Sequence, residues 1–295
     1  LGQWVIGQPE AVEQVARAVL RGRMGLAGAQ RPTASILLTG PTGTGKTQLC
    51  RALADCVYGS REALVRVDMS EYMEPNSVSR LIGAPPGYVG HDEGGILTEK
   101  VRRRPYCVVL LDELEKAHRD VTNLLLQMLE DGALTDAFGR TVNFRNTIVV
   151  MTSNLGSERT GQGSLGFTPQ PDEARWRAAL REAFRPELLG RIDCTVCFRP
   201  LDLAALTQIA QQMLRETASR AAAQGLTLTV SEDIAPFLAR QCAGDGSGAR
   251  ALRRLIRTQV EDPLAALMLE TPDMTAACLT LEAEQIAVCP ACFTE

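Results

Sequence analysis

One eight-residue stretch, Gly40–Thr47, constrains the fold more than any other part of the sequence. It reads Gly-Pro-Thr-Gly-Thr-Gly-Lys-Thr and fits the phosphate-loop pattern of a glycine, four residues and then Gly-Lys-Thr. The residues before it, Ser35–Thr39, are typical of a buried strand, and Gln48–Tyr58 after it are typical of a helix. Between a strand and a helix, glycines let successive backbone N–H groups point at phosphates. The sequence therefore predicts a nucleoside triphosphate site, with Lys46 on the β- and γ-phosphates and the Thr47 hydroxyl on magnesium.

Four further apolar segments predict the other strands of a parallel sheet. They are Leu64–Asp68, Val108–Asp112, Asn146–Thr152 and Thr195–Phe198. Val108–Asp112 is apolar up to its last residue, as expected for a strand that is covered on both faces. Helical patterns accompany the strands, at Pro9–Arg23, Gln48–Tyr58, His118–Glu130 and Ala174–Phe184. This alternation predicts an α/β fold with a parallel central sheet.

The pattern of the chain changes at Arg199-Pro200. The next segment, Leu203–Ala223, is rich in Ala, Gln and Leu and is strongly helical. Further helices are predicted at Ile234–Cys242 and Ala249–Leu269, and strands at Leu226–Val230 and Cys278–Ala283. We therefore expect a large α/β nucleotide-binding domain over residues 1–200 and a smaller, mainly helical C-terminal domain over residues 201–295.

Charge and composition argue against several classes of function. The net charge of −4 and pI of about 5.5 argue against a nucleic-acid partner, because such domains usually carry a basic excess. No apolar run approaches the roughly 20 residues of a membrane span, and the first residues lack the basic and apolar regions of a signal peptide. Cys194–Cys197 has the spacing of a zinc site, but a strand would point the two thiols to opposite faces. We expect a cytoplasmic protein with reduced thiols.

Two carboxylates and an amide follow neighbouring strands. Asp112 and Glu113 end one strand, and ligands of open parallel sheets bind beyond the carboxyl ends of the strands. Asp112 is expected to act on magnesium, through water, and Glu113 to polarise the attacking water as a general base. Asn154 follows the next strand. Its amide either orients that water or touches the γ-phosphate, or it closes a turn at the strand end.

Several further segments match the same family as these motifs. They are Val5-Ile6-Gly7-Gln8, Asp68-Met69-Ser70-Glu71-Tyr72, Gly83–Gly90, Val108–His118, Gly139-Arg140-Thr141, Phe184-Arg185-Pro186-Glu187, Arg191-Ile192-Asp193 and Gly248-Ala249-Arg250. With the phosphate loop, this set resembles the AAA+ ATPases, and more narrowly the second ATPase module of the Clp unfoldases, nearest to ClpC. The resemblance covers nearly the whole chain and weakens after about Asp273.

The resemblance implies roles at matching positions. Val5 and Ile6 would line the adenine pocket, Asn154 would be the first sensor, and Arg250 the second. Arg191 would be an arginine finger that reaches the nucleotide of the neighbouring subunit. The alternatives are an intrachain salt bridge for Arg191 and a helix-surface position for Arg250. The implied cofactors are ATP or ADP with Mg²⁺, held by Gly40, Pro41, Thr42, Gly43, Thr44, Gly45, Lys46, Thr47, Gln48, Asp112 and Arg250, with Thr47 and Asp112 on the metal side.

A loop rich in proline and glycine presents a single tyrosine. The segment Pro85-Pro86-Gly87-Tyr88-Val89-Gly90 cannot be a regular element, so Tyr88 either packs as a turn on the core or grips a substrate. The resemblance favours a pore loop of Gly87, Tyr88, Val89 and Gly90, in a homo-oligomeric ring that has six subunits in this family. A second pore loop is expected near Ala137-Phe138-Gly139, in a hairpin over Gly132–Phe144.

A hydrophobic tripeptide, Leu165-Gly166-Phe167, lies in the polar loop before the helix at Ala174–Phe184. In the protease-coupled Clp unfoldases, such a tripeptide docks on the ClpP peptidase, and ClpB disaggregases lack it. The implied function is an ATP-driven unfoldase that threads protein substrates toward a ClpP-type peptidase, with adaptor proteins as further partners in the family's manner. The alternatives are an ATP-dependent disaggregase that acts without a protease, a non-catalytic nucleotide-binding scaffold and a nucleic-acid motor.

Three positions depart from the family's pattern. Gln48 replaces the usual acidic residue after Gly-Lys-Thr, Gly190 replaces the usual asparagine before the finger arginine, and Cys242–Ser247 lacks the usual tyrosine. None of these changes removes a named catalytic group. Their expected effects are on the hydrolysis rate or on the docking of the small domain.

Overall fold

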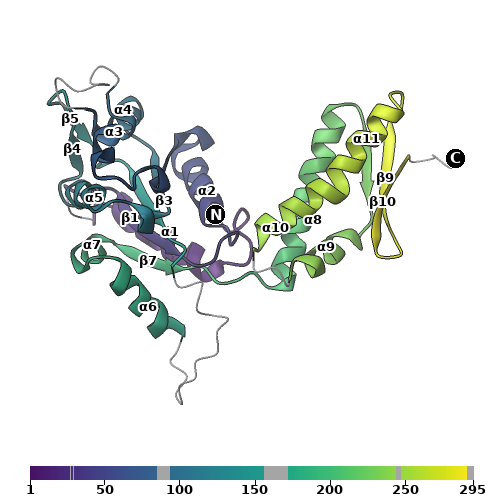
Figure 1. The fold of residues 1–295 in the computed structure, drawn as a ribbon, viewed down its shortest axis with the longest axis horizontal. Helices are drawn as coiled ribbons and strands as arrows, with labels where there is room; N and C mark the ends of the chain where they lie inside the picture. The colour runs from purple at the N-terminus through teal and green to yellow at the C-terminus, as the bar shows by residue number, and fades with distance from the viewer. Residues whose placement is uncertain (27, 29, 85–93, 156–171, 244–246, 291–295) are drawn as a thin grey trace, which may run out of the picture. The chain divides into compact units, whose positions relative to one another are not determined.

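The structure, a computed structural model, describes residues 1–26, 28, 30–84, 94–155, 172–243 and 247–290 (Figure 1). It divides into two compact units. The first comprises Leu1–Pro41 with Gly45–Arg199, and the second comprises Pro200–Glu295 with Thr42–Thr44. Each unit buries hydrophobic cores of its own.

A five-stranded parallel sheet forms the centre of the first unit. Its strands are β2 (Leu64–Asp68), β3 (Val108–Asp112), β6 (Ile148–Thr152), β1 (Ala34–Thr39) and β7 (Cys194–Cys197), in that spatial order. All four neighbouring pairs run parallel, so the carboxyl ends of the strands meet at one edge. The predicted α/β fold with a parallel central sheet is confirmed.

Helices bury both faces of this sheet. Along β1, Ile36 and Leu38 belong to one core and Leu37 to the other, because successive strand residues point to opposite faces. The core around Ile36 contains residues of α1 (Pro9–Arg23) and α2 (Lys46–Tyr58). The core around Leu37 contains residues of α3 (Val78–Ile82), α4 (Ile96–Arg103), α5 (Arg119–Asp131), α6 (Asp172–Ala183) and α7 (Pro186–Arg191). The continuous apolar strands therefore reflect burial on both sides.

Several short elements were not predicted from the sequence. Helices α3, α4 and α7 have 5, 8 and 6 residues, which gives too few turns for a clear apolar periodicity. Strands β4 (Ala133–Thr135) and β5 (Thr141–Asn143) pair antiparallel, which confirms the predicted hairpin over Gly132–Phe144.

The second unit packs helices against a three-stranded sheet. Its helices are α8 (Leu203–Ala223), α9 (Ile234–Cys242), α10 (Ala249–Ile256) and α11 (Asp262–Glu270). Its strands are β8 (Thr227–Val230), β9 (Ala276–Glu282) and β10 (Gln285–Pro290), in the order β10-β9-β8. The Asp202 side chain caps α8 by accepting a hydrogen bond from the Ala205 N–H at 2.7 Å. None of the described helices has both the length and the apolar character needed to cross a bilayer.

Two details of the second unit differ from the sequence prediction. The helix expected over Ala249–Leu269 is interrupted by a π-helical turn at Arg257–Glu261. Pro263 lies in the first turn of α11 and has no N–H to donate, so the regular hydrogen-bond ladder changes just before it. Strand β10 was not predicted, although it pairs with β9 from Ala277 to Glu282.

Candidate functional site

The chemistry-bearing residues of the first unit meet at the carboxyl edge of the central sheet. Strand β1 leads into Gly40, β3 into Glu113, and β6 into Ser153 and Asn154. The strand register places Asp112 beside Asp68 of β2. This edge is where a parallel sheet with helices on both faces binds its ligand.

Two glycines shape the start of the phosphate loop. Gly40 has φ of 120°, and a Cβ there would lie 2.3 Å from the carbonyl oxygen of Phe198, so a side chain is excluded. Gly45 has φ of 106° and caps the N-terminus of α2. The 13-residue helix α2 begins at Lys46, within this motif, and aims N–H groups at the space where phosphates would lie. The backbone therefore fits a nucleotide phosphate chain.

The Lys46 ammonium is buried within this loop. Its Nζ lies 2.5 Å from the carbonyl oxygen of Gly40 and 2.9 Å from that of Pro41. It also lies 3.0 Å from Oδ1 of Asn154. These three oxygens are neutral, and phosphate oxygens would be stronger partners for the positive charge of Lys46. Thr47 and Gln48 are half-buried in the first turn of α2, and Thr44 is buried.

Both carboxylate oxygens of Asp112 have protein partners. Oδ1 accepts a hydrogen bond from the Thr152 hydroxyl, and Oδ2 lies 2.7 Å from the Arg66 guanidinium. The negative charge of Asp112 also reaches α2, because it adds to burial in raising the pKa of the Cys50 thiol. A buried, oriented carboxylate next to α2 suits a group that holds magnesium through water. Sequence reasoning missed Arg66, whose only signal was its position on β2, two residues before Asp68.

Glu113 adopts a strained backbone conformation. Its φ of 58° and ψ of 51° lie in the left-handed region, which costs a residue with a side chain about 1–3 kcal/mol. Its N–H donates to the Thr152 hydroxyl at 3.1 Å, and its Oε2 lies 2.5 Å from Nζ of Lys116. Hydrogen bonding to Glu113, and the charge of Glu113, raise the pKa of Lys116. The carboxylate is therefore held at the sheet edge by contacts on its backbone and on its side chain.

Asn154 joins the phosphate loop to Glu113. Its Oδ1 accepts from Lys46 at 3.0 Å, and its Nδ2 donates to Oε1 of Glu113 at 3.4 Å. Its backbone N–H donates to Oε1 of Glu115 at 3.0 Å. The strand-end turn is closed instead by Ser153, whose hydroxyl accepts from the Leu155 N–H at 3.1 Å. The turn at the strand end is thus the role of Ser153, while the Asn154 amide contacts Lys46 and Glu113 of the site.

The N-terminal segment lies beside the phosphate loop. Val5 is buried, and one of its methyl groups would be 3.8 Å from a Cβ at Gly45, whereas Ile6 is half-buried. The Gln8 amide fixes this segment because it donates to the Arg199 carbonyl at 2.7 Å and accepts from the Arg199 N–H at 3.2 Å. An apolar surface next to the start of α2 suits an adenine ring.

The two arginines implied by the resemblance lie on different helices, one in each unit. Arg191 ends α7, and its guanidinium forms an ion pair with Glu130 at 2.8 Å. Both side chains of that pair are about half exposed, at 43% and 51%. Arg250 is exposed in the first turn of α10, in the second unit.

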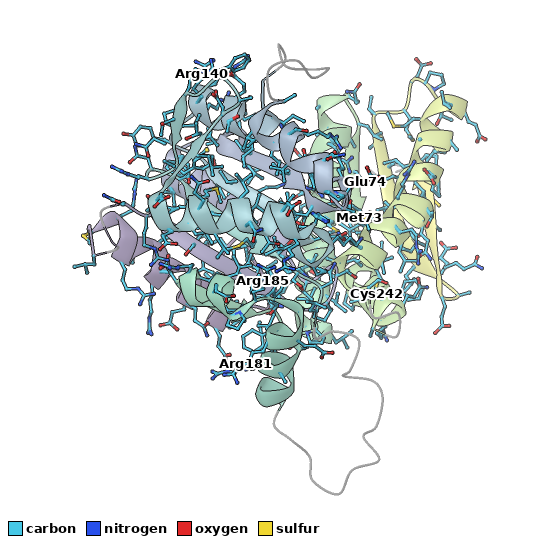
Figure 2. The ribbon with its side chains drawn as sticks, turned by 60° about the vertical axis from the view of Figure 1, so that its left-hand side comes forward. Met73, Glu74, Arg140, Arg181, Arg185 and Cys242 are labelled. Atoms are coloured by element: carbon cyan, nitrogen blue, oxygen red, sulfur yellow. The ribbon has the colours of Figure 1, made fainter. Side chains whose placement is uncertain are left out.

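The β4–β5 hairpin presents an aromatic ring at its tip. Phe138 is 42% exposed, and the Arg140 guanidinium, labelled in Figure 2, lies 4.7 Å from the ring centroid. The Asp136 carboxylate closes the turn by accepting the N–H groups of Phe138 and Arg140 at 3.0 and 2.9 Å. Burial alone would raise the pKa of Asp136, but its hydrogen bonds from Arg140 and Phe138 outweigh burial and lower that pKa.

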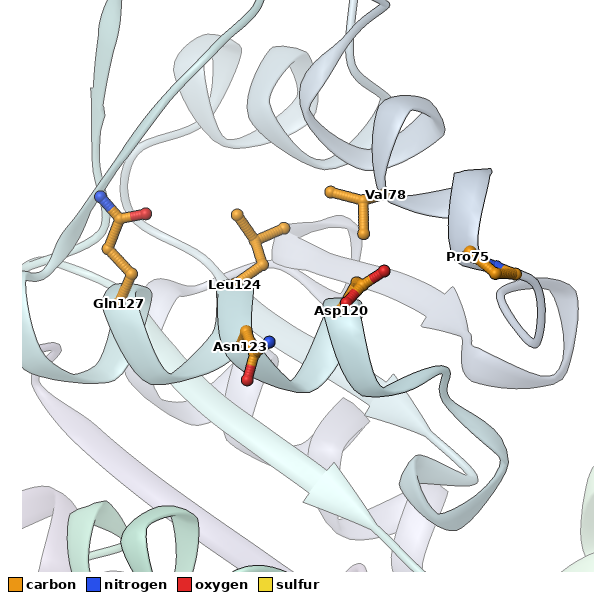
Figure 3. A pocket seen from close by; sticks show the side chains of 6 residues that line it. All are labelled: Pro75, Val78, Asp120, Asn123, Leu124 and Gln127. Carbon is orange, nitrogen blue, oxygen red and sulfur yellow. The ribbon is translucent and has the colours of Figure 1, made fainter.

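Two groups of predicted residues lie outside the described parts of the chain. They are the loop residues Gly87, Tyr88, Val89 and Gly90, and the tripeptide Leu165, Gly166 and Phe167. A separate open groove of about 470 Å³ lies between α5 and the segment around α3 (Figure 3). Its lining is Pro75, Val78, Asp120, Asn123, Leu124 and Gln127. None of the residues predicted to bind nucleotide lines this groove.

The chain matches two families of known domains. Residues 31–195 match the AAA domain (Cdc48 subfamily), and residues 201–275 match the C-terminal, D2-small domain of ClpB protein. The predicted resemblance to a Clp-type second ATPase module is confirmed by these matches and by the relatives below.

Individual relatives include chaperones of the ClpB type and a ClpC protein. Chaperone protein ClpB 2 of Parasynechococcus marenigrum is 53% identical over 92% of this chain and 30% of its own length. Chaperone protein ClpB of Pseudomonas putida is 51% identical over 96% of this chain and 33% of its own length. Negative regulator of genetic competence ClpC/MecB of Bacillus subtilis is 50% identical over 90% of this chain and 34% of its own length. The chain thus spans about a third of the length of these relatives, and its identity to the two types is nearly equal.

Proposed function

The chain belongs to the AAA family, as a Clp-type ATPase module, and we propose that it hydrolyses ATP to unfold and translocate protein substrates in the cytoplasm. One observation carries the hydrolytic part of this proposal. The Lys46 ammonium, the Asn154 amide and the Glu113 carboxylate form a continuous hydrogen-bonded chain at the carboxyl edge of the sheet. It links the residue expected at the phosphates to the residue expected at the attacking water.

The side chains of the first unit divide the hydrolytic work. Lys46 binds the β- and γ-phosphates, and Asn154 orients the water that attacks the γ-phosphorus. Glu113 accepts the proton of that water, while ADP leaves with the electrons of the broken bond between the β,γ-bridging oxygen and the γ-phosphorus. Thr47 and Asp112 would hold a magnesium ion, which when bound neutralises charge on the phosphate oxygens. Asp112 is oriented for this by Thr152 and Arg66.

Two arginines complete the proposed active site. Arg191 acts as a finger on the nucleotide of a neighbouring subunit in a hexameric ring, and Arg250 acts as the second sensor. The weak, half-exposed ion pair with Glu130 supports this role for Arg191, because its guanidinium can leave Glu130 at little cost. A finger supplied by a neighbour ties hydrolysis to assembly.

Tyr88→Ala tests the mechanical part of the proposal. We expect the variant to keep most of its ATPase rate but to lose unfolding of a tagged substrate protein, because the aromatic ring grips the extended chain and takes no part in the chemistry. The measurement pairs phosphate release with loss of fluorescence of a folded reporter. Phe138→Ala, in the second proposed pore loop, is the comparison. Normal unfolding by Tyr88→Ala would show that this tyrosine is not the gripping residue.

The destination of the unfolded substrate separates two forms of the proposal. In one, Leu165-Gly166-Phe167 docks on a ClpP-type peptidase and substrates are degraded. In the other, the module belongs to a disaggregase without a protease, and the match of residues 201–275 to the ClpB domain favours it. Both forms require the same ATPase cycle.

A peptidase pull-down distinguishes these two forms. If the tripeptide docks, the full chain retains a ClpP-type peptidase on a resin, and Leu165→Ala combined with Phe167→Ala reduces that binding at least tenfold. Reactivation of an aggregated enzyme is measured in parallel. Absent peptidase binding together with reactivation of aggregates would exclude the degradative form.

A further inference from the structure

We propose that Arg31 is a positioning residue for Arg191, and that it fixes the backbone from which Arg191 reaches a neighbouring nucleotide. This inference rests on the proposed role of Arg191 in trans. Arg31 lies just before β1, in a segment that none of the motifs in the sequence includes.

The Arg31 guanidinium contacts three elements at once. It donates to the carbonyl oxygen of Arg191 at the end of α7, and through Nε to that of Leu129 in α5, at 3.3 Å. It also lies 3.2 Å from Oδ1 of Asp193, which precedes β7. The planar fork of an arginine can make such divergent contacts together, whereas a lysine ammonium on a single flexible stem cannot. Arg31 therefore ties together the helix pair α5 and α7, which lie side by side in Figure 1, and the start of β7.

Ser35 of β1 also contacts the Arg191 carbonyl and the Asp193 carboxylate. The Ser35 hydroxyl lies 3.0 Å from the carbonyl oxygen of Arg191 and 2.7 Å from Oδ2 of Asp193, and it donates to one of them at a time. The Ser35 N–H donates to Oδ2 of Asp193 at 2.8 Å. Ser35 is buried, and β1 pairs with both β6 and β7. The contacts from Ser35 therefore hold the Arg191 backbone to the central sheet.

The side chain of Arg191 is held far less firmly than its backbone. Its guanidinium pairs with Glu130, and both groups are about half exposed. Water screens such a pair, so its contribution is small. Arg191 thus combines a backbone that is held in place with a guanidinium that can leave Glu130. A catalytic group needs this arrangement when it must reach a target outside its own subunit with little positional error.

Steady-state kinetics of Arg31→Ala and Arg31→Lys give the first test, in the full chain. We expect kcat for ATP hydrolysis to fall by about 10- to 100-fold in Arg31→Ala, since a displacement of about 1 Å can cost that much. The KM for ATP changes little, because the residues that bind nucleotide are intact. Arg17→Ala removes an arginine from an exposed ion pair with Glu13 and is the matched control, with an unchanged rate. Sedimentation velocity verifies that each variant still assembles.

Mixed assemblies separate a positioning role from a merely structural one. Glu113→Gln subunits cannot hydrolyse ATP but retain an intact Arg31 and Arg191, so they supply a well-placed finger to a neighbour. Mixing them with Arg31→Ala subunits should raise the rate several-fold above that of either variant alone. Arg191→Ala mixed with Glu113→Gln is the reference and should show the same gain. If Arg31→Ala does not fold, Arg31→Lys takes its place in the mixture.

The two mixtures also identify which part of the account fails. A gain with Arg191→Ala but none with the Arg31 variant would show that Arg31 acts within its own subunit, which overturns this inference and leaves the proposed function standing. No gain in either mixture would overturn the finger assignment itself. An unchanged kcat in Arg31→Ala would also refute the inference.

Discussion

Replacing Glu113 with glutamine is expected to lower the rate of ATP hydrolysis by a factor of about 10² to 10⁴ while ATP still binds. A neutral amide cannot accept the proton of the attacking water. Glutamine has nearly the same shape and retains an oxygen for the Asn154 amide, which lies 3.4 Å from Oε1 of Glu113. The ion pair of Glu113 with Lys116 is lost, but Lys116 is exposed and remains solvated.

The measurement compares phosphate release at saturating ATP with nucleotide affinity from calorimetry. Glu62→Gln removes an exposed glutamate that pairs with Arg104 and is the matched control, with wild-type behaviour in both assays. A Glu113→Gln variant that hydrolyses ATP at the wild-type rate would remove Glu113 from the general-base role. A wild-type chain with no hydrolysis in any assembled state would favour the non-catalytic scaffold.

Replacing Arg191 with alanine is expected to have an effect of similar size or larger. Arginine fingers contribute about 10³ to 10⁵ to the rate in enzymes that use them, because they stabilise charge that develops in the transition state. Arg191 lies outside the hydrogen-bonded cluster of Lys46, Asn154 and Glu113, and its guanidinium pairs with Glu130. A large loss of rate from a residue so placed would therefore point to action on another subunit.

Three companion measurements sharpen the test of Arg191. Nucleotide affinity should stay near the wild-type value in Arg191→Ala. Arg181→Ala, an exposed arginine of α6 that Figure 2 also labels, should leave the rate unchanged. Glu130→Gln frees the Arg191 guanidinium from its ion pair, and it should leave the rate unchanged or raise it. A rate within twofold of wild type for Arg191→Ala would reduce Arg191 to an intrachain salt bridge.

The sequence was most informative where one local rule decided the structure. A continuous apolar run predicted β3 with its observed bounds, because a strand covered on both faces shows no polar alternation. The phosphate loop could be recognised because glycines at Gly40 and Gly45 satisfy a backbone requirement that other residues cannot meet. The π-helical turn at Arg257–Glu261 was hidden, since Pro263 is compatible with the first turn of a helix as well as with a change in its hydrogen bonding.

The contacts of the site depend on tertiary structure, and local sequence does not reveal them. Arg66 and Arg31 are ordinary charged residues in the sequence, and only the fold brings them to Asp112 and the Arg191 backbone. The turn-closing role and the site-facing role at the end of β6 were likewise inseparable until Ser153 and Asn154 were seen with different partners. The spacing of the motifs along the sequence identified which strand ends carry the functional side chains. The hydrogen-bond and ion-pair partners of those side chains could be seen only in the folded chain.

The rate of ATP hydrolysis per subunit, followed across a wide range of protein concentration, tests the shared active site most directly. Sedimentation velocity at the same concentrations reports how much of the chain is assembled. If Arg191 of one subunit completes the site of the next, the rate per subunit rises steeply as subunits associate and falls toward zero on dilution. A rate per subunit that stays constant from isolated subunits to full assembly would contradict an active site built from two copies of the chain.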